Sequence, residues 1–384
     1  MSLVSSTREC IIAMLMLCPH RLTVDIIGKV ALDMELNTQQ EENPMISALR
    51  EQVHLIPNSG TLNPFAGWSP IGMYQRWRNS RIMVSYLDKV LEDRFATRAN
   101  EQQGEKRPRR RTMLDLAVES YRSQTSSSST RINGLDPEFK KHAITQIRVF
   151  VFAGHDTTSS AICYAIYLLQ KHPETLARVR AEHDRILGPV ETTADTIKAD
   201  PYIVNKLEYT NAVMKESLRL FPAASGLRTP DDTLVLRNPK TGEVLPTIPN
   251  MLLWVPHFGM HRDKTIWGPT ANDFDPSRFL PENASSLPEA GYRPFERGIR
   301  NCIGQDLAML ESRIVLAMVA RRYDFSPAFD ALEELSKDGS KYAENPKWRK
   351  GKQDLNGEVA YPVLIGSAKP REGMPMWVQE IRVQ

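Results

Sequence analysis

Cysteine is scarce in this sequence, and the few cysteines are scattered. The 384 residues contain four, without paired or C-x-x-C spacing: Cys10, Cys18, Cys163 and Cys302. This pattern argues against a disulfide framework and a zinc site, so a reducing compartment is the default expectation. An excess of charge of one sign is also lacking, because the net charge is only +3. This balance does not require nucleic acid or an anionic membrane, and we expect no nucleic-acid partner.

Long hydrophobic runs are missing as well. The apolar run of residues 10–18 stops short of the roughly 18 to 20 residues that a membrane span needs. Pro19, His20 and Arg21 follow it, where a signal peptide would have small residues at a cleavage site. The nucleotide-binding fingerprint G-x-G-x-x-G does not occur either. From the short apolar run and the missing cleavage site, we expect no transmembrane segment and no signal peptide in this chain.

The most informative stretch is residues 295–304, which read Phe-Glu-Arg-Gly-Ile-Arg-Asn-Cys-Ile-Gly. Cys302 comes just before an apolar, helix-forming run, so we expect its sulfur to lie at a helix N-terminus, where a thiolate is stabilised. Arg300 adds positive charge, and Gly298 and Gly304 let the backbone approach a flat ligand closely. An exposed, soft thiolate of this kind is suited to holding a metal or a haem iron.

The spacing F-x-x-G-x-R-x-C-x-G, which begins at Phe295, resembles the signature of the cytochrome P-450 family, the haem-thiolate monooxygenases, at all five fixed positions. The alternative is a buried structural cysteine, which is the commoner role of a lone cysteine. Three further motifs in the expected order argue against that alternative. The resemblance implies that Cys302 is the axial ligand of haem b, with Phe295, Gly298, Arg300 and Gly304 around the cofactor.

The second motif lies on a long predicted helix. Asp136 caps this helix, Pro137 fits its first turn, and the pattern continues to about Lys171. Apolar residues on both sides of its centre, 149–152 and 161–169, face most directions and predict a buried helix. Membrane insertion is the rival interpretation, but charged and polar residues interrupt the run.

Small and polar residues, Ala-Gly-His-Asp-Thr-Thr, occupy the centre of this helix at 153–158. Ala153 and Thr157 share a face at i,i+4, and the threonine hydroxyl can bond to the preceding turn. Taken alone, this is a helix kink with satisfied polar groups. The string also resembles the A-G-x-D-T-T oxygen-activation motif of the family, which implies a proton relay through Asp156 and Thr157 and contact of Ala153 with the cofactor. His155 takes a variable position of the motif, and we do not expect it to be a ligand.

The third and fourth motifs concern one predicted ionic cluster. Glu216 and Arg219 lie at i,i+3 on a predicted helix that spans 202–220, so their side chains can form a fork-to-fork pair. Such a pair alone is weak evidence, because solvated helices carry many. It resembles the E-x-x-R motif of the family because Arg278, in Phe-Asp-Pro-Ser-Arg-Phe, stands at the expected distance before the cysteine loop. The resemblance implies a structural lock of three residues that holds this loop.

The remaining segments give weaker indications. The resemblance places Arg228 against a haem propionate and residues 223–227 along the pocket. Short β-prone runs at 233–236 and 251–255 predict a small sheet region. A helix is expected over 21–34, with Asp25 and Lys29 paired at i,i+4. The tail, 325–383, reads as less regular, with a charged surface insertion at 330–357.

These observations lead to one prediction of fold. The composition, 41% hydrophobic and 25% charged, allows a large core. The resemblance covers about residues 21–368 and implies a mainly α cytochrome P-450 fold, with a helical lobe and a small β-rich lobe, in one domain from 1 to 384. In the family, a segment like 21–34 lies in the middle of the helical half. We therefore expect the usual N-terminal anchor and first helices to be absent from this chain.

The implied reaction is monooxygenation of a small apolar substrate with O2, with electrons from NADPH through a separate NADPH-cytochrome reductase. The amino-acid sequence of these segments is most similar to that of fungal microsomal members, many of which tailor secondary metabolites. A full-length form would lie on the cytosolic face of the endoplasmic reticulum membrane. Two alternatives remain: a haem-thiolate isomerase or dehydratase that needs neither O2 nor reductase, and an incomplete, haem-free chain without catalysis.

Overall fold

A computed structural model describes most of the chain, and its described residues form two compact units. The described residues are 4–5, 10–55, 69–101, 112–125, 135–231, 234–238, 240–248, 251–288, 290–331, 354–355 and 357–381. We call the two units unit 1 (Met1–Ala13, Ala161–Gly351, Pro375–Gln384) and unit 2 (Met14–Ser160, Lys352–Met374). The prediction of a single domain over 1–384 stays a prediction.

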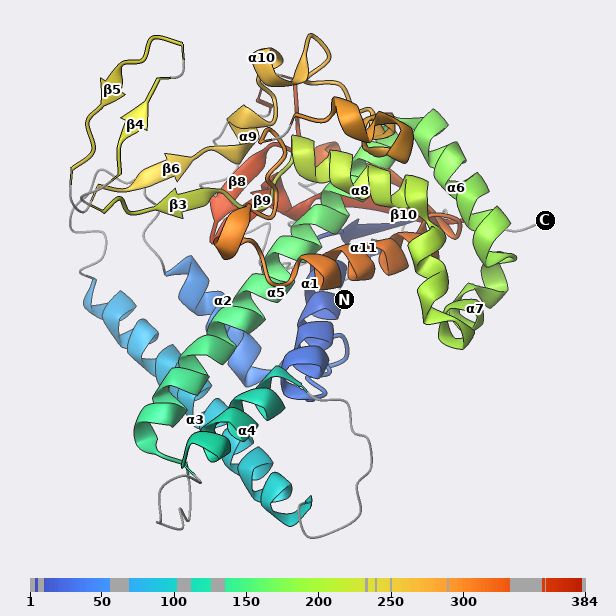
Figure 1. Cartoon of the computed structure of the whole chain (residues 1–384). Coiled ribbons are helices and arrows are strands. Elements are labelled where there is room, and N and C mark those ends of the chain that lie inside the picture. The colour runs from blue at the N-terminus through green and yellow to red at the C-terminus, as the bar shows by residue number, and fades with distance from the viewer. Residues whose placement is uncertain are drawn as a thin grey trace. The chain divides into compact units, whose positions relative to one another are not determined.

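Unit 2 is built mainly from helices (Figure 1). They are α1 (Leu17–Ile27), which continues into a π-helical turn (Gly28–Leu32), α2 (Pro44–His54), α3 (Pro70–Glu101), α4 (Met113–Thr125) and most of α5 (Pro137–Lys171). The π-helical turn ends at Asp33, whose φ is 53°. Arg94 of α3 donates from Nη2 to the carbonyl oxygens of Leu32 and Asp33, at 3.1 and 3.2 Å. Helix α3 thereby caps the C-terminal end of the first helical segment.

The first helix differs from its prediction in two ways. It begins at Leu17, four residues before the expected start. The expected pair of Asp25 and Lys29 is wrong, because Asp25 Oδ1 accepts from the amide and hydroxyl of Thr38 at 2.8 and 3.0 Å. Lys29 pairs instead with Asp33 at 3.1 Å. A loop that returns to the helix therefore offers this carboxylate better donors than the exposed ammonium does.

A β-hairpin completes unit 2. Strands β8 (Pro362–Ile365) and β9 (Ser367–Pro370) pair antiparallel around Gly366, whose φ of +76° suits glycine. A Cβ at Gly366 would also lie 2.9 Å from Phe152 of α5. From α5, Ser160 Oγ donates to the carbonyl oxygen of Ala368 at 2.6 Å. The hairpin is thus packed and hydrogen-bonded against the motif-bearing part of α5.

Unit 1 combines helices with small sheets. Its helices are the remainder of α5, then α6 (Pro173–Leu187), α7 (Thr193–Ala199), α8 (Glu208–Leu220), α9 (His257–Met260), α10 (Lys264–Trp267) and α11 (Gln305–Val319). One sheet has the order β1 (Val4–Ser5), β2 (Cys10–Met14), β10 (Pro375–Glu380), β7 (Tyr323–Pro327). Two strand pairs are β3 (Gly226–Arg228) with β6 (Leu253–Val255) and β4 (Leu236–Arg237) with β5 (Val244–Leu245).

Helix α8 is shorter than predicted, because a 3-10 segment (Pro201–Lys206) and Leu207 precede it. The reason lies in α6, where the carboxylate of Glu182 accepts from the amides of Tyr209 and Thr210 at 2.7 and 2.9 Å. These amides belong to the first turn of α8 and lack partners within the helix. A distant side chain therefore fixes where α8 begins.

The prediction of an irregular tail is wrong for most of the residues that the structure describes there. Strands β7 and β10 pair antiparallel, with Val378 opposite Phe325, and β8 and β9 form the hairpin of unit 2. The predicted insertion at 330–357 lies almost entirely outside the described residues. Burial of α5 is also uneven, because Val149 is 55% exposed while residues 161–169 are buried. Among the described helices, none combines the length and apolar content that crossing a membrane would require.

Candidate functional site

The cysteine loop of unit 1, residues 295–304, places Cys302 where the sequence predicts it. Cys302 lies two residues before Gly304, the N-cap of α11, and its thiol is free and exposed. The amide of Cys302 donates to the carbonyl oxygen of Phe295 at 2.8 Å, which closes the loop. Gly298 begins a 3-10 turn and has a φ of +80°, a conformation that favours glycine. A hydrogen-bonded turn thus presents the thiol beside a helix N-terminus.

Two apolar residues of the cysteine loop are exposed. Ile299 is 100% exposed and Ile303 is 80% exposed. Proteins do expose single apolar residues, but this short loop exposes two isoleucines together with a thiol, which is a soft ligand atom. Arg300 is exposed on the same loop. These residues fit a haem, because its ring is flat and apolar, its iron accepts a thiolate, and its propionates pair with cations.

Arg228, on β3, is connected to the cysteine loop through a carboxylate. Its Nη1 donates to the carbonyl oxygen of Leu227 at 2.8 Å, and its Nη2 lies 3.5 Å from Oε2 of Glu296. Of the segment expected to line a pocket, Ala223 is buried and Leu227 is exposed. The structure therefore brings Arg228 to the loop and leaves the β3 end of that segment open.

The three residues of the expected lock meet in unit 1. Glu216 and Arg219 are both 0% exposed, and Arg219 donates to the two carboxylate oxygens of Glu216 at 2.7 and 2.8 Å. Arg278 is more distant, with its Nε 3.6 Å from Oε1 of Glu216. Burial raises the pKa of Glu216, while both guanidiniums and the amide of Asp275 act in the opposite direction.

The lock reaches the cysteine loop through a residue that sequence reasoning missed, His261. Arg219 donates from Nη1 to the carbonyl oxygens of His261 and Ala271, both at 2.6 Å. Nε2 of His261 accepts from the amide of Arg293 at 3.0 Å, two residues before the loop begins. The pattern H-x-x-x-H at 257–261 was the signal available in the sequence. Hydrogen bonds thus connect Arg219 through His261 to Arg293, in the segment just before the loop.

The α5 motif lies in unit 2, and its members point in different directions. The hydroxyl of Thr157 donates to the carbonyl oxygen of Ala153 at 2.9 Å, as expected, and Ala153 is exposed. Asp156 is buried, and two residues of β9 hold its carboxylate. Ser367 Oγ donates to Oδ2 at 2.7 Å, and Lys369 Nζ lies 2.7 Å from Oδ1. The structure thus separates a fully paired carboxylate from a hydroxyl on a more open face of the helix.

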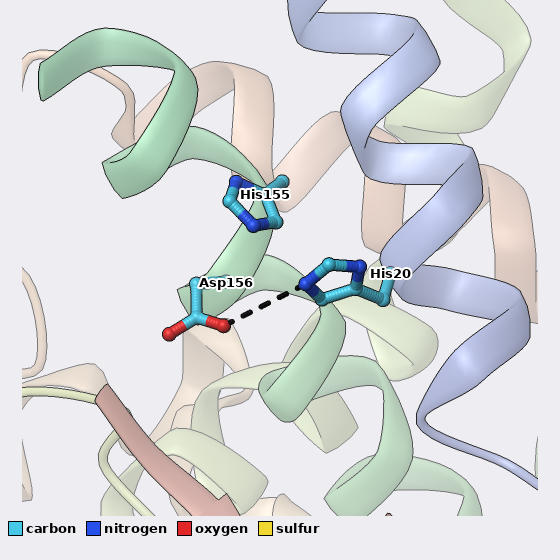
Figure 2. Close-up of side chains that lie close together, drawn as sticks. All are labelled: His20, His155 and Asp156. Atoms are coloured by element: carbon cyan, nitrogen blue, oxygen red, sulfur yellow. Dashed lines mark ion pairs between the residues drawn. The ribbon is translucent and has the colours of Figure 1, made fainter. Parts of the chain in front are cut away.

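Two histidines surround Asp156 (Figure 2). His20 of α1 has its Nε2 3.9 Å from Oδ1 of Asp156, and its ring meets that of His155 edge to face at 4.4 Å between centroids. Burial lowers the pKa of His20 to about 2 and lowers that of His155 as well. One ligand atom from each of the three residues fits within 4.8 Å, close enough for a metal ion. The ammonium of Lys369 already compensates this carboxylate, so a second cation would meet repulsion.

The family model for Cytochrome P450 matches residues 19–347. This chain belongs to the cytochrome P450 family.

Curated relatives agree with the family match. The chain is 35% identical to cytochrome P450 monooxygenase acrF of Aspergillus aculeatus over 93% of its own length and 71% of that protein. It is 35% identical to cytochrome P450 monooxygenase polC of Polytolypa hystricis, over 92% of this chain and 61% of that protein. It is 31% identical to bifunctional cytochrome P450/NADPH--P450 reductase 2 of Bacillus subtilis, over 79% of this chain and 26% of that protein.

These findings confirm the predicted family, the mainly helical P450 fold and the enzyme class, an oxidoreductase of the monooxygenase type. They also confirm the expected resemblance to fungal members. Within this P450, the roles of the individual residues remain predictions: Cys302 as ligand, Asp156 and Thr157 as relay, and the lock as support.

Proposed function

We propose that this cytochrome P450 binds haem b through the thiolate of Cys302 and oxidises a small apolar substrate with O2. The observation that carries the proposal is the exposed thiol of Cys302, on a loop that also exposes Ile299 and Ile303 and is closed by the hydrogen bond to Phe295. An apolar ring lying on this surface would cover both isoleucines and bring its iron to the sulfur. Burying such side chains stabilises a complex by about 25 cal/mol per Å² of apolar surface.

The other predicted residues support this binding mode. Arg228 and Arg300 would pair with the haem carboxylates, because both are cationic and exposed in unit 1. Gly298 and Gly304, which have no Cβ atom, would let the loop backbone approach the ring closely. Glu216, Arg219 and Arg278 would maintain the segment that leads into the loop. When bound, the haem would supply the oxygen-activating chemistry, and the thiolate of Cys302 would hold its iron.

In unit 2, Asp156 and Thr157 would handle protons. Thr157 Oγ1 can give up its hydrogen bond to Ala153 and donate elsewhere, since the carbonyl of Ala153 also belongs to the helix ladder. Asp156 can take up a proton at Oδ1 if Lys369 moves away from it, because the hydroxyl of Ser367 holds only Oδ2. A positioned acid and alcohol of this kind typically contribute about 10²- to 10⁴-fold to a proton-transfer step.

Electrons would come from NADPH through a separate NADPH-cytochrome reductase. The Bacillus subtilis relative carries both functions in its name, whereas this chain has no nucleotide fingerprint. The exposed Arg297, which the haem would not need, would attract an acidic reductase surface. By analogy with the fungal relatives, the substrate would be an intermediate of secondary metabolism, and a full-length form would lie on the endoplasmic reticulum membrane.

The decisive test is the carbon monoxide spectrum of the reduced protein. We expect the strongly red-shifted Soret band of a thiolate complex in the wild type and its loss in Cys302→Ser, with Cys163→Ser as the matched control. Retention of the band in Cys302→Ser would overturn the proposal, and absence of bound haem in the wild type would favour the haem-free chain. Turnover that needs neither O2 nor NADPH would favour an isomerase or dehydratase.

A further inference from the structure

Two histidines on α9 and its C-cap, His257 and His261, connect the lock to the cysteine loop. Both are buried, and their rings stack with 5.7 Å between centroids and 12° between planes. Nδ1 of His261 lies 3.1 Å from the carbonyl oxygen of Arg219, while Nε2 faces the amide of Arg293. One partner accepts and the other donates, so His261 is a neutral imidazole with its proton on Nδ1. Burial and the neighbouring His257 lower the pKa of His261 to about 4, in agreement with this assignment.

His257 has a different set of partners. Its Nδ1 lies 3.0 Å from the carbonyl oxygen of Ala224, and its Nε2 lies 3.0 Å from Oε1 of Glu296. A carbonyl oxygen only accepts hydrogen bonds, and an ionised carboxylate only accepts as well. A neutral His257 would therefore point a lone pair at an oxygen on one side of the ring. Only the imidazolium can donate to both partners.

Glu296 is the ionised partner that this argument needs. Burial raises the pKa of Glu296, but hydrogen bonds from Arg293 and His257 outweigh burial and make the net shift downward. Nη2 of Arg293 lies 2.7 Å from Oε2 of Glu296, and Arg228 lies 3.5 Å from the same oxygen. The charged or titratable groups that face the His257–Glu296 pair are thus Arg228, Arg293 and His261.

The backbone around Glu296 is arranged to permit this contact. Glu296 has a φ of +59°, which is uncommon for a residue with a side chain and persists only where surrounding contacts maintain it. A Cβ at Gly226 would lie 1.9 Å from Oε1 of Glu296, so the carboxylate needs glycine at that position. Glu296 directly follows Phe295, whose carbonyl oxygen accepts from the amide of Cys302. Displacement of Glu296 therefore moves the residue that closes the cysteine loop.

We propose that His257, as an imidazolium, is a positioning residue that anchors the cysteine loop through its ion pair with Glu296. The pair maintains the left-handed conformation of Glu296, keeps Phe295 in place under the amide of Cys302, and holds Arg228 at the loop. The consequence for thiolate ligation rests on the proposed role of Cys302. The proposed charge state of His257 does not rest on the role of Cys302, because it follows from the hydrogen-bond partners of His257 alone.

The first test is nuclear magnetic resonance of the full chain labelled with ¹⁵N-histidine. The probe is the diamagnetic reduced carbon monoxide form if haem binds, and the unliganded chain if it does not. At pH 7, the resonances that disappear in His257→Gln should show two protonated ring nitrogens. Those that disappear in His261→Gln should show protonation on Nδ1 only. A neutral His257 at pH 7 would overturn the proposal, whatever the spectrum of the haem.

The second test measures how fast the thiolate-type carbon monoxide band converts to a non-thiolate band in mild denaturant. Loss of a charge-assisted hydrogen bond predicts about tenfold faster conversion in His257→Gln and in Glu296→Gln. The double variant should be little faster than either single variant, because both remove the same interaction. Additive effects, or wild-type rates in both single variants, would overturn the positioning role. If the wild type shows no thiolate band at all, the assignment of Cys302 fails, and the resonance test still decides the charge of His257.

Discussion

Helices α8 and α11 of unit 1 each bury one glutamate, and the two glutamates have opposite surroundings. Glu216 of α8 receives hydrogen bonds from Arg219 and from the amide of Asp275. Glu311 of α11 is also buried, and its Oε1 has no hydrogen-bond partner among the residues that the structure describes. Burial raises the pKa of Glu311 to about 8, with no opposing cation. One site thus holds a carboxylate by pairing, and the other holds a neutral acid.

The difference shows that burial alone does not reveal what a carboxyl group contributes. Removing one partner of a buried ion pair is strongly destabilising, because the remaining charge stays in an apolar environment. A protonated acid without partners leaves no charge behind, and replacing it with a neutral group of the same shape removes a cost. We therefore expect mutations at Glu216 and Glu311 to change stability in opposite directions.

The largest expected effect is that of Glu216→Ala. Arg219 would be left buried without its carboxylate, which costs about 3 to 5 kcal/mol of unfolding free energy. Denaturant unfolding should show this loss, with poor haem content in the expressed protein. The matched control is Glu208→Ala, an exposed acid on the same helix, which should change stability little.

Arg219→Ala combined with Glu216→Ala should cost much less than the sum of the two single changes. Normal stability and haem content in Glu216→Ala would contradict the lock and show that the pair of Glu216 and Arg219 contributes as little as a solvent-exposed ion pair.

The parts of the site that the sequence predicts are those whose geometry is local. Glu216 and Arg219 lie one helical turn apart, so their spacing alone places them on one face. Residues 295–304 form one closed loop, so the motif fixes the position of Cys302 relative to α11. In the same way, the long helix α5 followed from its cap and its apolar pattern.

The partners that the sequence did not predict come from distant segments. Lys369 and Ser367 lie more than 200 residues after Asp156 in the chain, and only the packing of the β8–β9 hairpin on α5 brings them together. His261 is polar and buried, and its role depends on the carbonyl and amide that it meets. Strands β7 and β10 lie far apart in the chain, so their pairing is decided by tertiary contacts more than by local propensity.

The second prediction concerns the neutral acid, Glu311→Gln. The folded-state pKa of Glu311, about 8, lies above the unfolded value of 4.5. Its contribution to stability is therefore fully present below pH 4.5 and is lost as the pH rises toward 8. The amide does not titrate, so Glu311→Gln should stabilise the protein by up to about 3 kcal/mol at pH 7 and by almost nothing at pH 4.5.

Unfolding curves of wild type and Glu311→Gln at the two pH values provide the measurement. Destabilisation at pH 7 would show that Glu311 has an ionic partner and belongs with Glu216.

The third prediction concerns the ion pair between Asp156 and Lys369. Lys369→Met removes the ammonium from Asp156 and leaves Ser367 as its remaining close donor. We expect a loss of about 2 kcal/mol at pH 7, because Lys369 is partly exposed and makes one charge-assisted contact. Lys369→Arg should retain most of the stability. Addition of Asp156→Asn to Lys369→Met should recover stability, and failure to do so would show that Lys369 acts through packing.

The smallest effect on stability is expected for Thr157→Ala, one residue from Asp156. The variant removes one neutral hydrogen bond, from Oγ1 to the carbonyl oxygen of Ala153. That carbonyl oxygen still accepts its backbone hydrogen bond within the helix. The stability loss should stay near about 1 kcal/mol. Catalysis should respond far more strongly, because a positioned proton donor typically contributes about 10²- to 10⁴-fold to its step. With reductase present, NADPH should still be consumed while product falls and hydrogen peroxide rises, and Thr157→Ser should restore much of the coupling. An unchanged ratio of product formed to NADPH oxidised in Thr157→Ala would show that the hydroxyl has a purely structural role in the helical turn. Thr157 would then contribute one neutral hydrogen bond beside the charged, paired carboxylate of Asp156.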